Sequence, residues 1–244
     1  MIRSWYVLVL AAAGILRAQQ PAPAVAPQAA PQAPSADHQL TAQLMDADTK
    51  KSSGDMAGAL KGYEAALARV RNTPAIANRE EEVLQRLSGG YIASNRYQDA
   101  LTVNRRILAL HAEDCKAGAP FHDRCADALY GVSVSHMFLG QFTDAAAELE
   151  RAVAVLRSMG DKGDLFVRMT RVKNLGNLES MLGAAQFRAG DKEKAVATLH
   201  RAIADLKSVA DNTRLDAATR STARKSMDDA QASVNLLEPP AAKR

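Results

Sequence analysis

The side chains best suited to chemistry lie together in one segment of the chain, from His111 to Cys125. The segment contains both cysteines, Cys115 and Cys125, and two of the five histidines, His111 and His122. In an oxidising compartment the cysteines most simply form a disulfide, closing a loop of about ten residues. All four side chains could instead bind a metal ion, although their spacing matches no standard zinc pattern. We predict a Cys115–Cys125 disulfide and no metal, with free thiols and a metal site as alternatives.

The rest of the sequence has no motif that is typical of catalysis. No serine or cysteine lies in a nucleophile elbow, and no glycine-rich loop has the spacing that holds phosphates. Gly89 and Gly90 fall inside a predicted helix, where close packing is the expected reason for glycine. We therefore expect no catalytic residue, no cofactor and no enzymatic activity.

The composition favours an all-α protein that does not bind nucleic acid. Alanine is abundant, and aromatic residues make up only 5% of the chain. Alanine costs least in a helix, so this composition favours helices packed through small side chains. The sequence has 31 basic and 27 acidic residues, and the two kinds alternate through the predicted helices. No basic block with interleaved aromatic residues occurs, which disfavours a nucleic-acid partner.

Residues 1–18 have the features of a secretory signal peptide. Arg3 gives a positive start, an apolar run of about 12 residues follows, and the segment ends at Ala18. The run is too short to span a bilayer comfortably, and an uncleaved signal anchor is the alternative. Residues 19–36 are rich in Pro, Ala and Gln, which predicts a disordered, semi-rigid linker. We expect a periplasmic or secreted protein with no membrane span after cleavage.

From Asp37 onward a helix–turn–helix pattern occurs four times. Each turn has Gly, or Asn in its place, because these residues adopt the left-handed conformation at a helix end. The turns are Gly54-Asp55, Asn95-Arg96, Gly140-Gln141 and Gly190-Asp191. Small residues recur seven positions before each turn residue (Ala47, Ser88, Ser133, Gly183) and five after it (Ala59, Ala100, Ala145, Ala195). We predict that these small residues form the seams of four closely packed helix pairs.

The pattern resembles the tetratricopeptide repeat (TPR), whose signature places W-x2-L-G-x2-Y in the first helix and an alanine after the turn. The best match is Leu84-x2-Leu87-Ser88-x2-Tyr91. No unit has the Trp, His136 takes the Tyr position in the third unit, and the alanine spacing exceeds the family's repeat of about 34 residues. The resemblance, to the exported bacterial type of this family, implies an all-α solenoid of about four helix–turn–helix units.

We place the TPR-like repeats in residues 37–210, a C-terminal capping helix in residues 211–238 and a short tail in residues 239–244. Thr73 is expected to cap the helix that starts at Pro74, and Asp164 to cap a later one. The last helix has an apolar face that would cover the open end of a solenoid. That face contains Leu215, Ala223, Met227, Ala230, Val234 and Leu237.

In TPR proteins the first helix of each unit lines an inner groove that holds a peptide, so the resemblance implies which residues contact a partner. Helical spacing also places on that face Glu82, Gly89, Asp127, Asn177, Ser180 and Ala184. The predicted partner-binding residues, several with adaptable apolar side chains, are Gln85, Ile92, Tyr130, Val134, Met137, Phe138 and Phe187. Covering of these residues by the C-terminal helix or by neighbouring packing is the alternative. The family's carboxylate clamp is missing, with only Arg86 basic at a matching position, so chaperone-tail binding is not expected.

We expect an exported scaffold or adaptor for protein–protein interaction, acting in the assembly of a cell envelope. Its partner would be a protein or peptide that the sequence does not identify. One alternative is a self-associating structural subunit of an envelope complex, which would be a homo-oligomer. Another is a metal-binding protein built on the Cys/His segment.

We predict cleavage after Ala18, which makes Gln19 the first residue of the exported chain. Trp5 is the only tryptophan, so the processed protein would contain none. Intact-mass measurement of the protein recovered from an exporting host checks the cleavage site, and tryptophan fluorescence should be absent. Recovery of a chain that retains Trp5 would contradict the prediction and favour a signal anchor.

Overall fold

The computed structural model describes residues 34–116, 122–160 and 162–238. The chain divides into Met1–Pro34 and Ser35–Arg244, and the fold below is that of the second unit. The predicted signal peptide, nearly all of the predicted linker and the predicted tail lie outside the described residues.

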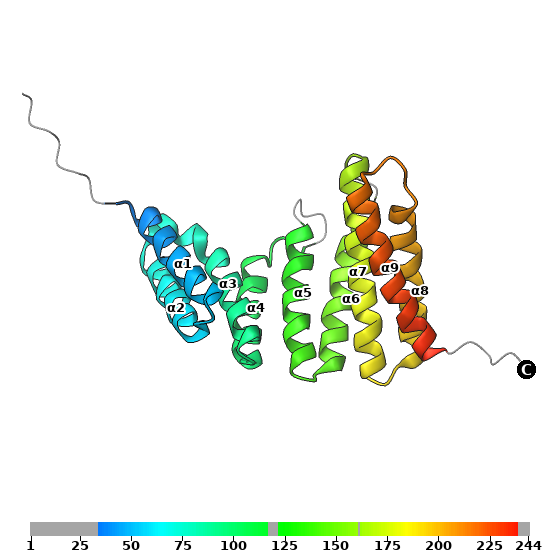
Figure 1. The fold of residues 1–244 in the computed structure, drawn as a ribbon, viewed down its shortest axis with the longest axis horizontal. Helices are drawn as coiled ribbons and strands as arrows, with labels where there is room; N and C mark the ends of the chain where they lie inside the picture. The colour runs from blue at the N-terminus through cyan, green and yellow to red at the C-terminus, as the bar shows by residue number, and fades with distance from the viewer. Residues whose placement is uncertain (1–33, 117–121, 161, 239–244) are drawn as a thin grey trace, which may run out of the picture. The chain divides into compact units, whose positions relative to one another are not determined.

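The described residues form α-helices and one 3-10 helix, with no strand among them (Figure 1). In chain order the elements are α1 (Ala36–Ser52), α2 (Met56–Asn72), η1 (Pro74–Arg79), α3 (Glu80–Ala93), α4 (Tyr97–Leu110), α5 (His122–Phe138), α6 (Phe142–Ser158), α7 (Leu165–Arg188), α8 (Lys192–Ala210) and α9 (Ala217–Leu237). The all-α fold class is confirmed. None of these described helices has the length and apolar character needed to cross a membrane.

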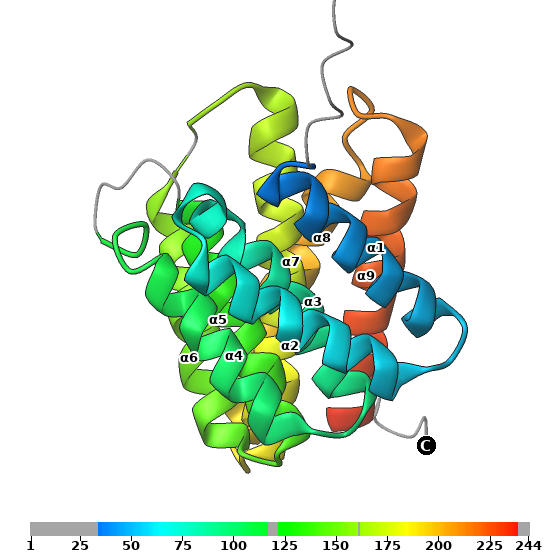
Figure 2. The same ribbon diagram turned by 90° about the vertical axis from the view of Figure 1, so that its left-hand side faces the viewer.

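Each helix packs against its neighbours in chain order, which is the arrangement of a helical-repeat solenoid. The pairs are α1 with α2, α3 with α4, α5 with α6 and α7 with α8, and the second helix of each pair contacts the first helix of the next. Figure 2 views these helices from the side where α1 and α2 lie. Helix α9 packs along α8 and also contacts α7.

The four turns between paired helices share one backbone geometry. The backbone angle φ is 88° at Gly54, 57° at Asn95, 72° at Gly140 and 95° at Gly190. At each turn the following amide bonds the carbonyl oxygen five residues back, as in a Schellman motif. Asn tolerates this left-handed conformation better than other residues with a Cβ, which explains its place in the second turn. The predicted turns are confirmed.

The predicted seams are the places where paired helices approach closely. The four alanines that follow the turns have no exposed surface: Ala59, Ala100, Ala145 and Ala195. Across the seam of the last pair, a Cβ added to Gly183 would lie 2.7 Å from Leu199 Cγ. A larger side chain there would force the helices apart, because close-packed interiors have no room to absorb it.

Gly89 and Gly90 differ in their surroundings, which corrects the expectation that close packing explains both. A Cβ added to Gly90 would lie 2.7 Å from Leu60 Cδ2, whereas one added to Gly89 would meet nothing within 4 Å. Gly90 is buried against α2 and Gly89 is exposed. Close packing therefore accounts for Gly90 only.

Several helices begin at a side chain that accepts a bond from a backbone amide. Asp164 caps α7 as predicted, with its carboxylate 2.9 Å from the Val167 amide nitrogen. Thr73 occupies the N-cap position before Pro74 as predicted, but its side chain makes no capping bond. Pro74 instead opens a 3-10 turn, for which its fixed φ and missing N–H are suited, and α3 begins only at Glu80.

The first junction between units is tied by a carboxylate held between two arginines, an arrangement called here an Arg–Glu–Arg tie. Glu80 of α3 accepts from Arg71 of α2 at 3.3 Å and from Arg106 of α4 at 2.8 Å. The hydrogen bond from Arg106 is the main reason that the pKa of Glu80 is lowered. The tie thus joins α2 and α4 through α3.

A second Arg–Glu–Arg tie lies at the third junction. Glu179 of α7 accepts from Arg157 of α6 at 2.5 Å and from Arg201 of α8 at 3.3 Å. These arginines occupy the same positions relative to their turns as those of the first tie. Glu179 itself is fully buried, at a position where the second and third units have Leu84 and Leu129. A carboxylate at such a position requires charged partners, and the two arginines provide them.

The second junction is held by neutral groups. Asn104 of α4 is buried and its amide donates to the carbonyl oxygen of Gly131 at 2.8 Å and to Ser135 Oγ at 2.9 Å, both on α5. A Cβ added to Gly131 would lie 3.3 Å from the Asn104 side chain. The absence of a side chain at Gly131 therefore lets α4 and α5 approach closely enough for these bonds.

Helix α9 covers the last pair with the apolar face that the sequence predicts. Ala223, Ala230 and Val234 are buried, together with Leu215 just before the helix, while Met227 and Leu237 are partly buried. Ala223 belongs to a cluster with Val209 and Ala210, and Val234 to one with Leu199. The C-terminal capping helix is confirmed as part of the fold.

We predict opposite effects for alanine at the two adjacent glycines. Gly89→Ala should stabilise the protein by about 0.5–1 kcal/mol, because the exposed helix position gains helix propensity at no steric cost. Gly90→Ala should destabilise it, because the new methyl group would meet Leu60. Urea unfolding of both variants measures the difference, and equal effects would contradict the packing described for α3.

Candidate functional site

Three adjoining hollows lie along the first helices of the second, third and fourth units. The proximal, middle and distal hollows have volumes of about 200, 260 and 390 Å³. The proximal and middle hollows share Asp127, and the middle and distal hollows share Tyr130, Asn177 and Met181. Together they form a continuous surface, called here the groove.

The middle hollow has two unlike walls and an apolar floor. Helix α5 provides one wall through side chains spaced to lie on one face: Asp123, Asp127 and Tyr130. Helix α7 provides the other wall with two amides and a thioether: Asn174, Asn177 and Met181. Leu156 of α6 and Leu178 of α7 are buried beneath them. The hollow therefore combines negative charge on one side with an apolar base.

The distal hollow extends the groove as far as α9. Ser226, Asp229 and Ser233 of α9 line it together with Tyr130 and Ser180. Helix α9 therefore forms part of the groove wall in addition to covering the last helix pair.

The proximal hollow lies over the second junction. Helix α3 contributes Glu81, Gln85 and Ser88, and α5 contributes Arg124 and Asp127. The buried amide of Asn104 also reaches its wall. Ile107, Ala128 and Gly131 complete the lining, so polar and apolar groups are mixed in this hollow.

The groove carries an excess of negative charge. Among its lining residues are four carboxylates, Glu81, Asp123, Asp127 and Asp229, and a single guanidinium, Arg124. The pKa of Asp127 is raised, first because the surrounding protein displaces water from it and then because of the charges of Asp123 and Glu81. His111 opposes these effects and lowers the pKa. On the α5 wall, neighbouring negative charges therefore disfavour the charged form of Asp127.

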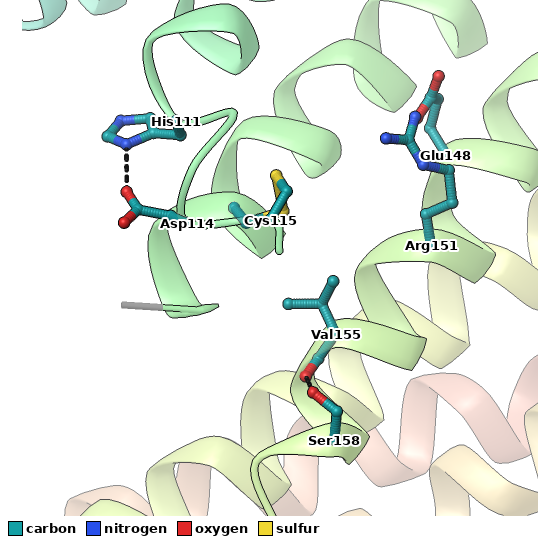
Figure 3. Close-up of a disulfide and its surroundings, with 8 residues drawn as sticks. His111, Asp114, Cys115, Glu148, Arg151, Val155 and Ser158 are labelled. Atoms are coloured by element: carbon teal, nitrogen blue, oxygen red, sulfur yellow. Dashed lines mark hydrogen bonds and ion pairs between the residues drawn. A yellow bond between two sulfur atoms is a disulfide. The ribbon is translucent and has the colours of Figure 1, made fainter. Parts of the chain in front are cut away.

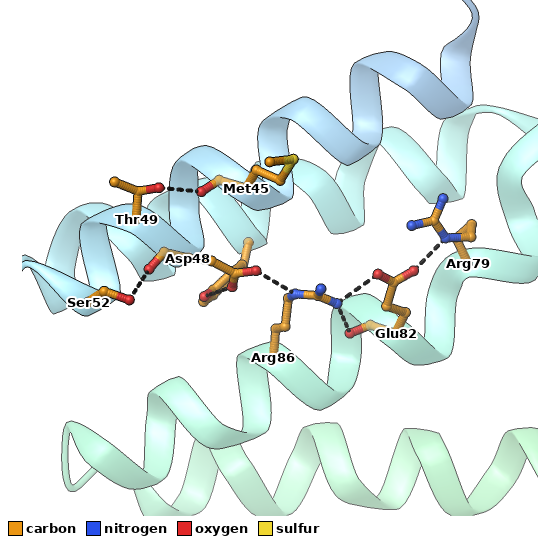
Figure 4. Close-up of polar contacts among 8 residues, drawn as sticks. Met45, Asp48, Thr49, Ser52, Arg79, Glu82 and Arg86 are labelled. Atoms are coloured by element: carbon orange, nitrogen blue, oxygen red, sulfur yellow. Dashed lines mark hydrogen bonds and ion pairs between the residues drawn. The ribbon is translucent and has the colours of Figure 1, made fainter.

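The corresponding face of the first two units is occupied by ion pairs. Arg86 of α3 lies 3.3 Å from Asp48 of α1 and 2.8 Å from Glu82 (Figure 4). Arg79 bonds both Glu82 and Asp37. Arg86 is the basic residue at a position matching the TPR carboxylate clamp, and these contacts engage its guanidinium. The groove accordingly begins at α3 and continues away from α1.

Two of the seven predicted partner-binding residues lie on groove walls. Tyr130 lines the middle and distal hollows, with 41% of its surface exposed, and Gln85 lines the proximal hollow. Of the other residues that helical spacing placed on the inner face, Asp127, Asn177 and Ser180 line the groove. Glu82, Gly89 and Ala184 do not line these three hollows. The structure therefore brings Tyr130 together with polar and acidic residues.

The other five predicted residues lie off the walls of these three hollows: Ile92, Val134, Met137, Phe138 and Phe187. Met137 is partly buried against the core of the third unit. Phe138 is half exposed and stacks on Tyr97, with ring centroids 4.9 Å apart. Phe187 is 46% exposed in the last turn of α7. A role for these five residues in binding stays a prediction.

Sequence reasoning missed several groove residues for two different reasons. Asp123 and Asn174 lie about one turn before predicted residues of the same helix, so the helical period could have found them. Asp229 and its neighbours on α9 had no such signal, because their place depends on how α9 folds back over α7 and α8.

The two cysteines of the Cys/His segment form a structural link beside the groove. Cys115 and Cys125 lie at disulfide distance, with Cα atoms 5.1 Å apart, and join the end of the second unit to α5 (Figure 3). His111 is buried, with Nδ1 2.9 Å from Asp114 and Nε2 3.2 Å from Glu81. Sulfurs bonded to each other cannot coordinate a metal as thiolates. The described residues contain no cluster of potential metal ligands.

Comparison with solved structures supports the TPR-like fold. A putative kinesin light chain from Podosopora anserina with nearly identical TPR-like repeats has a TM-score of 0.54 at 16% identity, over 84% of this chain and 98% of that one. A variant of that protein has a TM-score of 0.56 at 18% identity, over 82% of this chain and 91% of that one. BtubC (BKLC) from P. vanneervenii has a TM-score of 0.53 at 18% identity, over 79% of this chain and 75% of that one. No protein-family model and no curated protein matches the sequence. At these identities the likeness concerns the fold alone.

We predict that Asp127→Asn raises the stability of the folded protein at neutral pH. The raised pKa means that the folded state favours the protonated carboxyl, so the charged form costs stability above that pKa. The cost disappears as the pH falls through the raised pKa, and the advantage of Asn should disappear with it. Thermal unfolding of both proteins at neutral and acid pH measures this.

The matched control is Asp228→Asn on α9, a residue that is exposed like Asp127 but lines none of the three hollows. It should change stability only slightly. A lower stability of Asp127→Asn at neutral pH would contradict the electrostatic description of the α5 wall.

Proposed function

We propose that this protein is a scaffold that holds a segment of a partner protein in the groove. The observation that carries the proposal is the continuity of the three hollows, which share wall residues across α3, α5, α7 and α9. A row of adjoining hollows suits an extended polypeptide, which presents side chains at regular intervals along its length.

The size and chemistry of the hollows favour a peptide over a small molecule. Two of the three are smaller than the roughly 300–1,000 Å³ of small-molecule sites. Their amide and hydroxyl side chains offer partners for peptide N–H and C=O groups: Gln85, Asn177, Ser180 and Ser226. The groove has no pairing of nucleophile and base, so we propose a binding protein and not an enzyme.

The packing of the helices supports the same proposal. Helical repeats present extended surfaces built from successive units, although the fold alone does not fix a function. The Arg–Glu–Arg ties and the Asn104 bonds hold α3, α5 and α7 against their neighbours. A groove with fixed walls binds a segment without the entropy cost of ordering its own side chains.

We further propose that the protein acts after export, in a bacterial cell envelope or outside the cell. The signal-peptide features of residues 1–18 support export. The Cys115–Cys125 pair supports it too, because disulfides persist in oxidising compartments.

Site-specific photo-crosslinking in an exporting host tests the groove. A photoreactive amino acid is placed at Tyr130 or Asn177 on the groove walls. The expected result is a discrete crosslinked product from both positions, with the contacted segment of the partner identified by mass spectrometry.

The control positions are Arg105 on α4 and Arg151 on α6, which are exposed and line none of the three hollows. They should give no such product. Crosslinks confined to the control positions, or absent from both groove positions, would contradict binding in the groove.

A further inference from the structure

We propose that the bound segment carries an arginine whose side chain enters the middle hollow between α5 and α7. The guanidinium would pair with Asp123 and Asp127 and lie against the ring of Tyr130. This inference rests on the proposed function and specifies the chemistry of its ligand.

The charge of the hollow favours a cationic side chain. Asp123 and Asp127 are one helical turn apart on α5, a spacing at which like charges repel. Glu81 approaches Asp127 from α3 and contributes to the same repulsion. Within the described residues, neither aspartate takes part in an ion pair, although many carboxylates elsewhere on the surface do. A positive group entering the hollow would relieve the repulsion.

The shape of the hollow suits a long side chain with an apolar stem. Leu156 and Leu178 form its floor, and Met181 lies on the wall opposite the aspartates. An arginine can place its methylene groups on this base while its charged end reaches the α5 wall. The volume of about 260 Å³ is appropriate for one such side chain with accompanying water.

The residues of the α5 wall favour arginine over lysine. A guanidinium forms two parallel bonds to a carboxylate and can bridge two acidic groups, whereas an ammonium acts as a compact point charge. The partly exposed ring of Tyr130 offers a face on which a planar guanidinium can stack. Arg124 lines the neighbouring proximal hollow, and the middle hollow itself has no basic residue among its lining.

A peptide titration followed through Met181 tests the proposal. The processed full chain is labelled with 13C at its methionine methyl groups, and the Met181 signal is assigned with Met181→Leu. The probes are acetyl-Gly-Ser-Arg-Ser-Gly-amide and the same peptide with lysine or citrulline in place of arginine. The arginine peptide should shift the Met181 signal to saturation, more tightly than the lysine peptide, and citrulline should give no saturable shift.

Variants locate the binding site. Asp127→Asn and Asp123→Asn should each lower the affinity for the arginine peptide by about tenfold. This is the loss expected for one charge-assisted contact. Tyr130→Leu should reduce the preference for arginine over lysine. Asp228→Asn, with the same change in net charge, should bind like the unaltered protein.

The proposal is overturned if citrulline binds as tightly as arginine, if neither aspartate variant weakens binding, or if the arginine peptide gives no saturable shift. These outcomes are separable from failure of the groove itself. Crosslinking at Tyr130 without preference for arginine would remove the arginine site and leave peptide binding intact. If neither crosslinking in the groove nor a preference for arginine is observed, both the groove and the arginine site are ruled out.

Discussion

The structure depends on the close approach of paired helices at small side chains. Ala59, Ala100, Ala145 and Ala195 are fully buried at the seams, and Gly183 leaves no space for a methyl group against Leu199. With so few aromatic residues, the core combines buried leucine side chains with short distances between backbones at the seams. The close packing at the seams holds the two helices of each pair together as a unit. It thereby sets the direction in which the face of each first helix points.

The three junctions between those pairs use different chemistry to the same end. Arg–Glu–Arg ties centred on Glu80 and Glu179 join the outer two, while Asn104 and the Cys115–Cys125 link serve the middle one. The desolvation of both charges offsets much of the attraction in a buried ion pair, so such pairs add little net stability. The groove passes over the middle and last junctions, so its walls depend on these contacts for their spacing.

The amino-acid sequence predicts the repeats well because their determinants are local. The left-handed turn residues and the alanines after them identify four helix pairs, and the helical period places Asp127 and Asn177 on the correct face. Asp123 and Asn174 follow the same period, whereas two other features depend on distant contacts. Nothing near Gly89 distinguishes it from Gly90, since the difference is the presence of Leu60 on another helix. Likewise, the part of α9 in the groove follows from its packing on α7 and α8.

Glu179 also restricts the order in which the units can follow one another. It replaces the leucine that the second and third units have at this position, and it needs an arginine from the preceding unit, Arg157, as well as its own Arg201. The residue equivalent to Arg157 one unit earlier is Ala112. A rearranged chain with the fourth unit directly after the second would therefore place the buried carboxylate opposite alanine. The units share a fold, yet they are not interchangeable modules, because one buried charge determines which unit must precede the fourth.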